Sequence, residues 1–193
     1  MKLVLASTSK FKKEILNNVG LKHRSIASEE KEIKTKNPYD YAKEKSYNKA
    51  LSIINQVTKD EIIIGLDTIV LINNKIVEKP KSLKEVQTNL KNASNNITKI
   101  ITGYTLINKS INEIVTDYKE SIVEFEEIKD KDIKFYIENE KDAMYASGFI
   151  IETICSNFIK KIEGSYYNIL GVPVESIYKT LNKWDIYLKD IEE

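Results

Sequence analysis

The stretch that decides the fold is EIIIGLDTIVLI, residues 61–72. Its β-branched and aliphatic side chains predict a buried central strand. The Asn73-Asn74 pair that follows predicts a turn into the run KIV at 75–77, so the strand leads into a hairpin. One carboxylate, Asp67, interrupts the apolar run directly after Gly65-Leu66. The stretch therefore predicts both the centre of a sheet and a candidate site within it.

Apolar spacing and capping residues predict the elements around this strand. They are a strand at 2–6, a helix between Ser9 and Gly20, a helix from Asn37-Pro38 to about Ile54, a helix at 83–93 after Ser82, strands at 97–108 and 114–126, a helix capped by Asp130 or Asp132 through Ile137, and a helix at 174–184. The segment 143–173 receives no assignment. Strands interleaved with helices indicate an α/β protein, and adjacent strand pairs imply a mixed sheet.

Composition restricts the class of protein. A chain of 193 residues is long enough for one large domain or for two lobes sharing a cleft. Because 29 acidic residues nearly balance 30 basic ones, the chain is not expected to coat nucleic acid. The single cysteine, Cys155, cannot form an internal disulfide, which favours a reducing cytoplasm. No apolar run is long enough to predict a signal peptide or a membrane span.

Asp67 is the first candidate for chemistry. A carboxylate in an apolar strand needs a cation or a metal to stabilise its charge, which describes a general base or a Mg²⁺ ligand. The alternative is an aspartate that hydrogen-bonds its own backbone at a strand end. The residue alone leaves both interpretations open.

The first strand-to-helix turn, LASTSKFKKEIL at 5–16, is the second candidate. A helix N-terminus with exposed N–H groups binds anions, and lysines there are unfavourable unless an anion lies nearby. The residues that would surround such an anion are Ser7, Ser9, Lys10, Lys12 and Lys13. A capped surface helix with solvated lysines explains the same residues.

Three further charged positions are weaker candidates. Glu32 belongs to an acidic cluster with Glu29 and Glu30, and it could complete a metal site with Asp67. Lys49 lies on the predicted second helix, and Lys79 precedes Pro80. For each of them, a solvated surface charge is the simpler interpretation.

Together, seven fragments resemble the Maf family of nucleoside triphosphate pyrophosphatases over nearly the whole chain. They are LASTSKFKKEIL at 5–16, Glu32 after an acidic loop, Lys49-Ala50, GLDTIV at 65–70, EKP at 78–80, TGYTL at 102–106 and GSYYNILGVP at 164–173. The first fragment is also similar to the opening of the inosine triphosphatase family. The GLDT, EKP and GSYYN segments favour Maf.

The resemblance implies an activity and roles for residues. The family hydrolyses a nucleoside triphosphate between its α- and β-phosphates with a divalent metal, Mg²⁺ or Mn²⁺. By position, Ser7, Ser9, Lys12 and Lys79 would bind the triphosphate, with Lys49 as a further cation that we place among the catalytic residues. Asp67 and Glu32 would hold the metal and activate water. The implied architecture is one Maf-like domain over 1–193, an elongated mixed β-sheet with flanking helices and two lobes around a cleft, in a homodimer.

Three positions bear on the base of the nucleotide. In the family, a subfamily selective for dTTP and UTP has arginine where this chain has Phe11, threonine after the catalytic aspartate, and glutamine where this chain has Glu152. Another subfamily, which prefers 7-methyl-GTP, has an aromatic residue at the first place and glutamate at the last. Phe11 and Glu152 match the second subfamily and Thr68 matches the first. The predicted base preference is therefore mixed.

Two other functions are compatible with the same sequence. An inosine or xanthosine triphosphate pyrophosphatase would use similar chemistry on a different base. A non-catalytic regulator of septum formation, or a nucleic-acid-binding protein, would use the basic loop without hydrolysis. The near-neutral net charge of +1 speaks against nucleic-acid binding.

Overall fold

The computed structural model describes residues 1–29, 33, 35–145 and 147–192. The chain forms two compact units. The first unit comprises Met1–Thr68, Ile101–Glu120 and Ser165–Glu193, and the second unit comprises Ile69–Ile100 and Ser121–Gly164.

The strands of the described residues belong to one mixed sheet of seven strands with the order β2-β1-β3-β5-β6-β7, in which β4 pairs with β3. Their bounds are β1 Lys2–Ala6, β2 His23–Ile26, β3 Glu61–Ile72, β4 Lys75–Val77, β5 Ile97–Asn108, β6 Glu113–Phe125 and β7 Ile159–Glu163. β1 runs parallel to β2 and β3, whereas the β3–β4 and β6–β7 pairs are antiparallel. With the flanking helices, this confirms the predicted α/β class with a mixed sheet.

The predicted helices are present, and α5 is an additional short helix within the segment 143–173 that receives no assignment from the sequence. Their bounds are α1 Lys10–Asn18, α2 Pro38–Ser52, α3 Leu83–Ala93, α4 Asp130–Asn139, α5 Tyr166–Ile169 and α6 Val174–Lys183, with 3₁₀ turns at Ile54–Gln56, Ile154–Phe158 and Leu188–Asp190. The prediction that Asp130 or Asp132 caps α4 is wrong, because Lys129 holds the cap position without a side-chain bond and both aspartates lie in the first turn. There they still favour the helix through its dipole.

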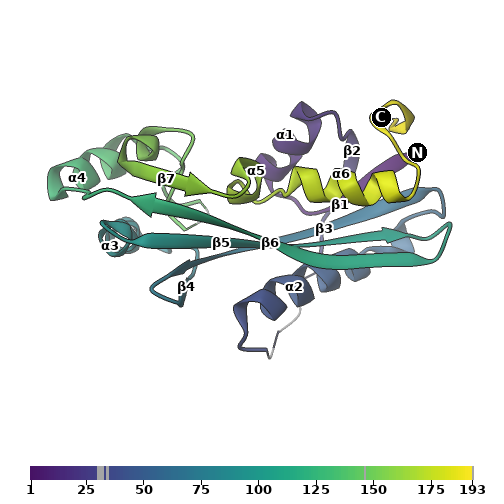
Figure 1. The fold of residues 1–193 in the computed structure, drawn as a ribbon, viewed down its shortest axis with the longest axis horizontal. Helices are drawn as coiled ribbons and strands as arrows, with labels where there is room; N and C mark the ends of the chain where they lie inside the picture. The colour runs from purple at the N-terminus through teal and green to yellow at the C-terminus, as the bar shows by residue number, and fades with distance from the viewer. Residues whose placement is uncertain (30–32, 34, 146, 193) are drawn as a thin grey trace. The chain divides into compact units, whose positions relative to one another are not determined.

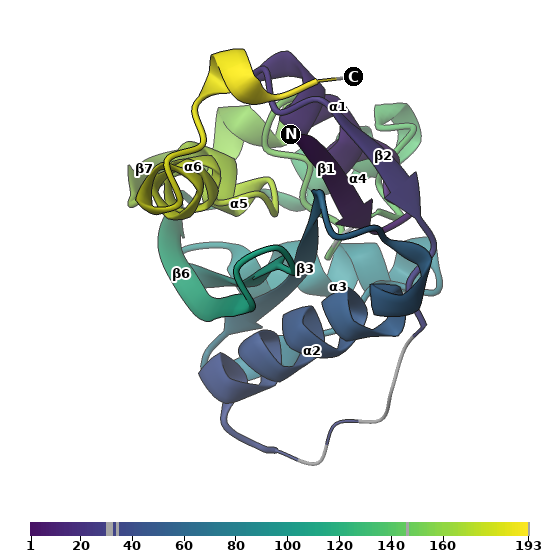
Figure 2. The same cartoon turned by 90° about the vertical axis from the view of Figure 1, so that its right-hand side faces the viewer.

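Side chains of β1 and β3 alternate between two hydrophobic clusters in the first unit. Leu3, Leu5 and Leu66 join a cluster with buried residues of α1 and α6, whereas Val4 and Ile63 join a second cluster with Ala50 of α2. Figures 1 and 2 show α1 and α6 on one side of β1 and α2 on the other side. Because successive strand residues point to opposite faces, burial on both faces explains the unbroken apolar sequence.

Two glycines let α2 lie unusually close to the sheet. A Cβ atom on Gly65 of β3 would collide with the Ser46 carbonyl oxygen and come within 2.9 Å of the Ala50 Cβ. A Cβ on Gly103 of β5 would collide with the backbone of Ala42. Ala42, Ser46 and Ala50 are all fully buried and recur every four residues, so one small-residue face of α2 contacts both strands. This contact determines the distance between α2 and β3.

An ion pair joins β2 and β3, the two strands that flank β1. Arg24 donates from Nε to Glu61 Oε1 at 2.6 Å and from Nη2 to Oε2 at 2.9 Å. Glu61 also accepts the Thr58 backbone N–H at 2.9 Å and is 6% exposed. Mainly through the Arg24 hydrogen bonds, the pKa of Glu61 falls from 4.5 to about 2.

Replacing Glu61 by glutamine should therefore cost about 2 kcal/mol of unfolding free energy at pH 7. The folded-state pKa lies below the unfolded one, so the contribution is complete above about pH 4.5 and is lost as the pH falls toward 2. Urea unfolding should give a higher free energy of unfolding for wild type than for Glu61→Gln at pH 7. At pH 3 this difference should be less than half as large. The exposed Glu14→Gln control should leave the midpoint unchanged, and an equal difference at both pH values would refute the pair's role.

The second unit has its own packing around a buried phenol. The Tyr136 hydroxyl of α4 donates to the Gly148 carbonyl at 3.0 Å and accepts the Ile150 N–H at 3.1 Å. Asn89 of α3 donates to the Ser147 carbonyl at 3.0 Å. The two helices thus hold the backbone of residues 147–150, which ends two residues before Glu152.

Candidate functional site

The loop from β1 to α1 lies beside the middle of β3 because the two strands run parallel. Leu5 pairs with Ile64, so the residues after Ala6 continue alongside Leu66. Lys12, in the first turn of α1, donates from Nζ to the Leu66 carbonyl oxygen at 3.1 Å. The start of α1 is thereby attached to the residue that precedes Asp67.

Asp67 pairs with Lys49 across the contact between β3 and α2. Strand alternation turns Asp67 to the same face as Ile63 and Gly65, which is the face that α2 covers. There Lys49 Nζ lies 2.5 Å from Asp67 Oδ1, with the two side chains 15% and 14% exposed. The strand aspartate is therefore paired with a cation from another element, not with its own backbone.

Lys12 is the second cation of this site. Burial lowers the pKa of its ammonium group from 10.5 to about 8, although the Asp67 charge raises it. The neighbouring Lys49 charge lowers it further. Lys12 thus remains mostly charged at pH 7 but loses its proton more readily than an exposed lysine.

The serines of the loop have backbone partners. The Ser7 hydroxyl accepts the Ser9 backbone N–H at 3.2 Å. Ser9 is the N-cap of α1, as predicted, but its side chain makes no capping hydrogen bond. The first N–H groups of α1 are therefore not used by their own cap residue, as an anion-binding helix start requires.

Thr68 lies on the opposite face of β3 from Asp67, within a network that the sequence did not reveal. Its hydroxyl lies 3.1 Å from the hydroxyl of Thr102 on β5, and Thr102 donates to the Asn168 carbonyl oxygen at 3.1 Å. Gly171 closes the group: with φ +86°, a Cβ there would lie 2.8 Å from Thr68 Oγ1 and 3.3 Å from Lys12 Cε. The motifs TGYTL and GSYYNILGVP contain these residues, but neither motif by itself indicated a contact with Thr68.

The remaining predicted residues lie elsewhere or outside the described residues. Phe11 is partly exposed on α1 in the first unit. In the second unit Lys79 is exposed, with Nζ 5.0 Å from the centroid of the Tyr145 ring, and Glu152 is exposed in a turn. Glu32 lies outside the residues that the structure describes. The site is therefore built from Ser7, Ser9, Lys12, Lys49, Asp67 and Thr68 in the first unit alone.

The donor set fits a divalent metal that arrives with a phosphate ligand. Within 1–29, 33, 35–145 and 147–192, no group of three or more histidine, cysteine or acidic residues could hold a metal ion. Mg²⁺ is usually bound through one or two carboxylates, substrate phosphates and water. Asp67, half-buried in contact with Lys49 and with the charge of Lys12 nearby, suits that mode of binding.

Cys155 is not a candidate nucleophile. Burial raises the pKa of its thiol to about 12, so the reactive thiolate is scarce at neutral pH. The thiol is fully buried. It serves as a small apolar core residue.

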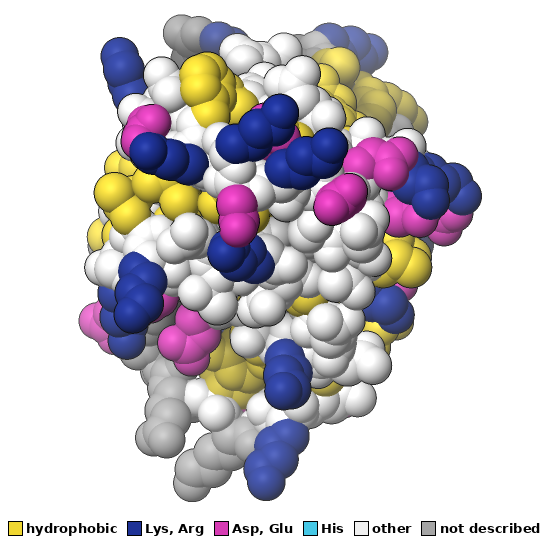
Figure 3. Space-filling view, turned by 90° about the vertical axis from the view of Figure 1, so that its left-hand side faces the viewer, with side chains coloured by type: hydrophobic (Ala, Val, Ile, Leu, Met, Phe, Trp, Pro, Cys, Tyr) yellow, Lys and Arg dark blue, Asp and Glu magenta, His cyan; other side chains and the backbone are white. Residues whose placement is uncertain are grey.

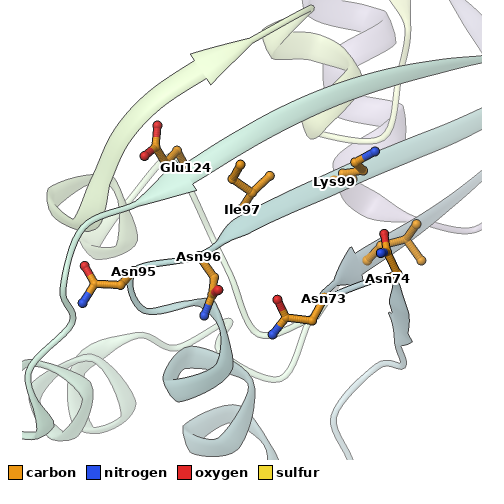
Figure 4. Close-up of a pocket in the computed structure, with 8 residues that line it drawn as sticks. Asn73, Asn74, Asn95, Asn96, Ile97, Lys99 and Glu124 are labelled. Atoms are coloured by element: carbon orange, nitrogen blue, oxygen red, sulfur yellow. The ribbon is translucent and has the colours of Figure 1, made fainter.

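Figure 4 shows a separate hollow in the second unit, with a volume of about 450 Å³. It is lined by side chains of two turns and of β3, β5 and β6, namely Leu71, Asn73, Asn74, Asn95, Asn96, Ile97, Lys99 and Glu124. Asn73, Asn74 and Asn95 have φ between 51° and 60°, a left-handed conformation that asparagine tolerates. Turn geometry explains these asparagines, and none of the predicted site residues lines the hollow.

The charge on the face drawn in Figure 3 is mixed. Lysine and arginine side chains are interspersed there with acidic and apolar ones. Separately, the helices among the described residues include none with the length and apolar character to cross a membrane.

Comparison with known proteins gives consistent matches. A family profile described as Maf-like protein matches residues 2–184. A dTTP/UTP pyrophosphatase of Thermoanaerobacter sp. (strain X514) is 33% identical over 184 residues, which cover 95% of this chain and 96% of that protein. Proteins of the same name from Clostridium perfringens (strain SM101 / Type A) and Alkaliphilus oremlandii (strain OhILAs) are 34% identical over 189 residues, covering 96% of this chain and 98% of each relative.

These matches span the same region as the seven sequence fragments. They confirm the predicted resemblance over nearly the whole length of the chain. The chain belongs to the Maf-like protein family.

Proposed function

We propose that the chain is a nucleoside triphosphate pyrophosphatase that cleaves the α–β phosphate bond and releases a nucleoside monophosphate and pyrophosphate. The observation that carries the proposal is the Asp67–Lys49 pair with Lys12 beside it, in one half-buried site of the first unit. The names of the relatives, dTTP/UTP pyrophosphatase, agree with the predicted enzyme class.

The cations of this site bind the triphosphate. A triphosphate is strongly anionic, and stabilising its charge is most of the work in phosphoryl transfer. Lys12 and Lys49 supply two ammonium groups in a place with little water, where their attraction to phosphate is stronger than at the surface. Ser7, Ser9 and the first N–H groups of α1 add neutral donors. Lys79 stays a predicted triphosphate ligand that rests on the family resemblance alone.

Asp67 is the acid–base residue of the proposal. Its carboxylate accepts a proton from the attacking water as the water oxygen bonds to phosphorus and the bridging P–O bond breaks. Lys49, 2.5 Å away, fixes the orientation of that carboxylate. When bound, a divalent metal on Asp67 and Glu32 supplies further positive charge for the phosphates.

The base preference that we propose is for dTTP and UTP. The names of the relatives support it, and Thr68 matches the subfamily with this preference. Phe11 and Glu152 instead match the subfamily that prefers 7-methyl-GTP, so that nucleotide belongs in the assay.

One assay tests the function directly. Purified protein with Mg²⁺ or Mn²⁺ is incubated with dTTP, UTP, CTP, 7-methyl-GTP, GTP and dITP, and pyrophosphate is measured. We expect stoichiometric pyrophosphate release, fastest with dTTP or UTP. The highest kcat/KM with dITP would favour an inosine or xanthosine triphosphate pyrophosphatase. No release from any of these nucleotides would refute the enzyme, and salt-dependent DNA or RNA binding without hydrolysis would favour the nucleic-acid-binding alternative.

We further propose that residues 1–193 act as one Maf-like domain in a homodimer. The family profile, which spans residues 2–184, supports the single domain. Light scattering of the purified protein tests the dimer, since a monomeric mass at assay concentration would contradict it.

The Lys12 ammonium makes nucleotide binding depend on pH. Its pKa of about 8 in the free protein should rise toward the usual value when phosphate binds, so binding takes up a proton above pH 8. We expect Kd for a non-hydrolysable α,β-imido nucleotide to rise about tenfold between pH 7 and pH 9, measured by calorimetry.

Lys12→Arg provides the control, because arginine keeps its charge throughout this range. The variant should bind with a Kd that changes less than twofold between pH 7 and pH 9. A flat profile for the wild type, or the same slope for both proteins, would remove Lys12 from nucleotide binding.

A further inference from the structure

The two threonine hydroxyls of the first unit form a hydrogen-bond chain with a fixed direction. A hydroxyl has one proton, and Thr102 donates its proton to the Asn168 carbonyl oxygen, which cannot donate in return. In the contact with Thr68, 3.1 Å long, Thr102 must therefore accept. The Thr68 proton is used inside the protein, and the Thr68 oxygen can act toward a ligand only as an acceptor.

Gly171 keeps space open next to this oxygen. A Cβ at that position would lie 2.8 Å from Thr68 Oγ1 and 3.3 Å from Lys12 Cε, closer than ordinary contact with the oxygen allows. Thr68 is partly exposed, whereas Thr102 and Asn168 are fully buried. The buried pair thus orients a hydroxyl that a ligand can reach.

We propose that Thr102 is a positioning residue that holds the Thr68 hydroxyl as an acceptor for a hydrogen-bond donor on the bound nucleoside. The donor is either an N–H of the base or a hydroxyl of the sugar. The proposal rests on the proposed function, and it adds that the Thr68 hydroxyl selects the nucleoside as a hydrogen-bond acceptor. Uracil and thymine carry an N–H at ring position 3, where cytosine carries an acceptor nitrogen, so an acceptor at Thr68 favours the first two.

The place of Thr68 on its strand determines which kinetic constant should respond. Asp67 and Thr68 are consecutive in β3, so they point to opposite faces of the sheet. Asp67 meets α2, whereas Thr68 meets β5 and the segment around Asn168 and Gly171. Loss of the hydrogen bond between Thr68 and Thr102 should therefore change KM more than kcat.

The test compares kcat and KM for UTP, CTP and 3′-deoxy-UTP in wild type, Thr102→Val and Thr102→Ser. In Thr102→Val the Thr68 hydroxyl loses its acceptor and can turn its proton toward the ligand. We expect KM for UTP to rise about fivefold, with kcat within twofold, and Thr102→Ser to restore KM. If the donor is the base, KM for CTP does not rise and can fall, because the released Thr68 hydroxyl can donate to the acceptor nitrogen of cytosine. If it is the 3′-hydroxyl, KM rises for UTP and CTP but not for 3′-deoxy-UTP.

Thr105→Val is the matched control on the same strand. Thr105 is also fully buried, and its hydroxyl contacts Ser46 Oγ at 2.9 Å and Thr116 Oγ1 at 3.0 Å. It should lose comparable thermal stability without a change in KM. Thr68→Val, which removes the acceptor itself, should raise KM for UTP as Thr102→Val does, and it replaces that variant if Thr102→Val fails to fold.

Three results would overturn the inference: wild-type KM values in Thr102→Val or Thr68→Val, no recovery in Thr102→Ser, or an equal KM increase in Thr105→Val. Failure of the proposed function looks different, because the wild type itself would then release no pyrophosphate.

Discussion

Replacing Asp67 by asparagine should lower kcat for pyrophosphate release by about a thousandfold or more. Asparagine has nearly the same shape and can still accept a hydrogen bond from Lys49, so the fold should persist. It cannot take a proton from water, and it removes the negative charge that contacts Lys49 and interacts with Lys12. The measurement is steady-state hydrolysis of dTTP with Mg²⁺, together with a thermal unfolding curve.

Binding without metal gives a second readout for the same variant. Because Asp67→Asn leaves two lysines without the Asp67 carboxylate, nucleotide should bind as tightly as to wild type or more tightly when metal is absent. Asp60→Asn, an exposed aspartate just before β3, is the matched control and should keep wild-type kcat. A kcat for Asp67→Asn within tenfold of wild type would remove Asp67 from the acid–base role.

Replacing Gly103 by alanine should cost about 3 kcal/mol of unfolding free energy, near the upper end for overpacking a core. The added methyl group would collide with the backbone of Ala42, which cannot turn away as a flexible side chain could. Relief therefore requires α2 to move away from β5. Since α2 carries Lys49, the same movement should lengthen the Lys49–Asp67 contact and lower kcat in the protein that remains folded.

Gly20→Ala separates this collision from the general effect of replacing a glycine. Gly20 has φ +81°, but a Cβ there would meet only the Leu188 side chain at an ordinary 3.8 Å. We expect a loss of about 1 kcal/mol from its left-handed backbone and no change in kcat. Urea unfolding measures the free energy of unfolding of both variants. An equal decrease in Gly103→Ala and Gly20→Ala would contradict the close packing of α2.

Local signals explain which elements could be predicted from the sequence. The Asn37 side chain accepts the N–H groups of Tyr39 and Asp40, and Ser82 accepts that of Glu85, so these helix starts depend on neighbouring residues. β7 was missed because its apolar residues, Ile159 and Ile162, are three apart. Glu124 and Phe125 of β6 pair with Lys161 and Ile159, so Lys160 is an extra residue in β7, and this bulge disrupts the period of two.

The site was harder to predict because its contacts are not local. Asp67 and Lys49 were each ambiguous alone, since the distance between α2 and β3 depends on Gly65 and Gly103 in different parts of the sequence. Thr102 resembled any buried threonine of a strand until its partners were known. Residue type and order therefore indicated the family, whereas the pairs that define the site became evident only from the structure.

The alternation of Asp67 and Thr68 along β3 has a consequence for how such a protein can change over evolution. The two neighbours contact different elements, Lys49 of α2 in one case and Thr102 of β5 in the other. Under the proposed function, a mutation beside Thr68 can redirect the enzyme to another nucleoside while the hydrolytic residues on the other face stay unaltered. Two adjacent strand positions thus carry separable traits, hydrolysis at Asp67 and the choice of nucleoside at Thr68.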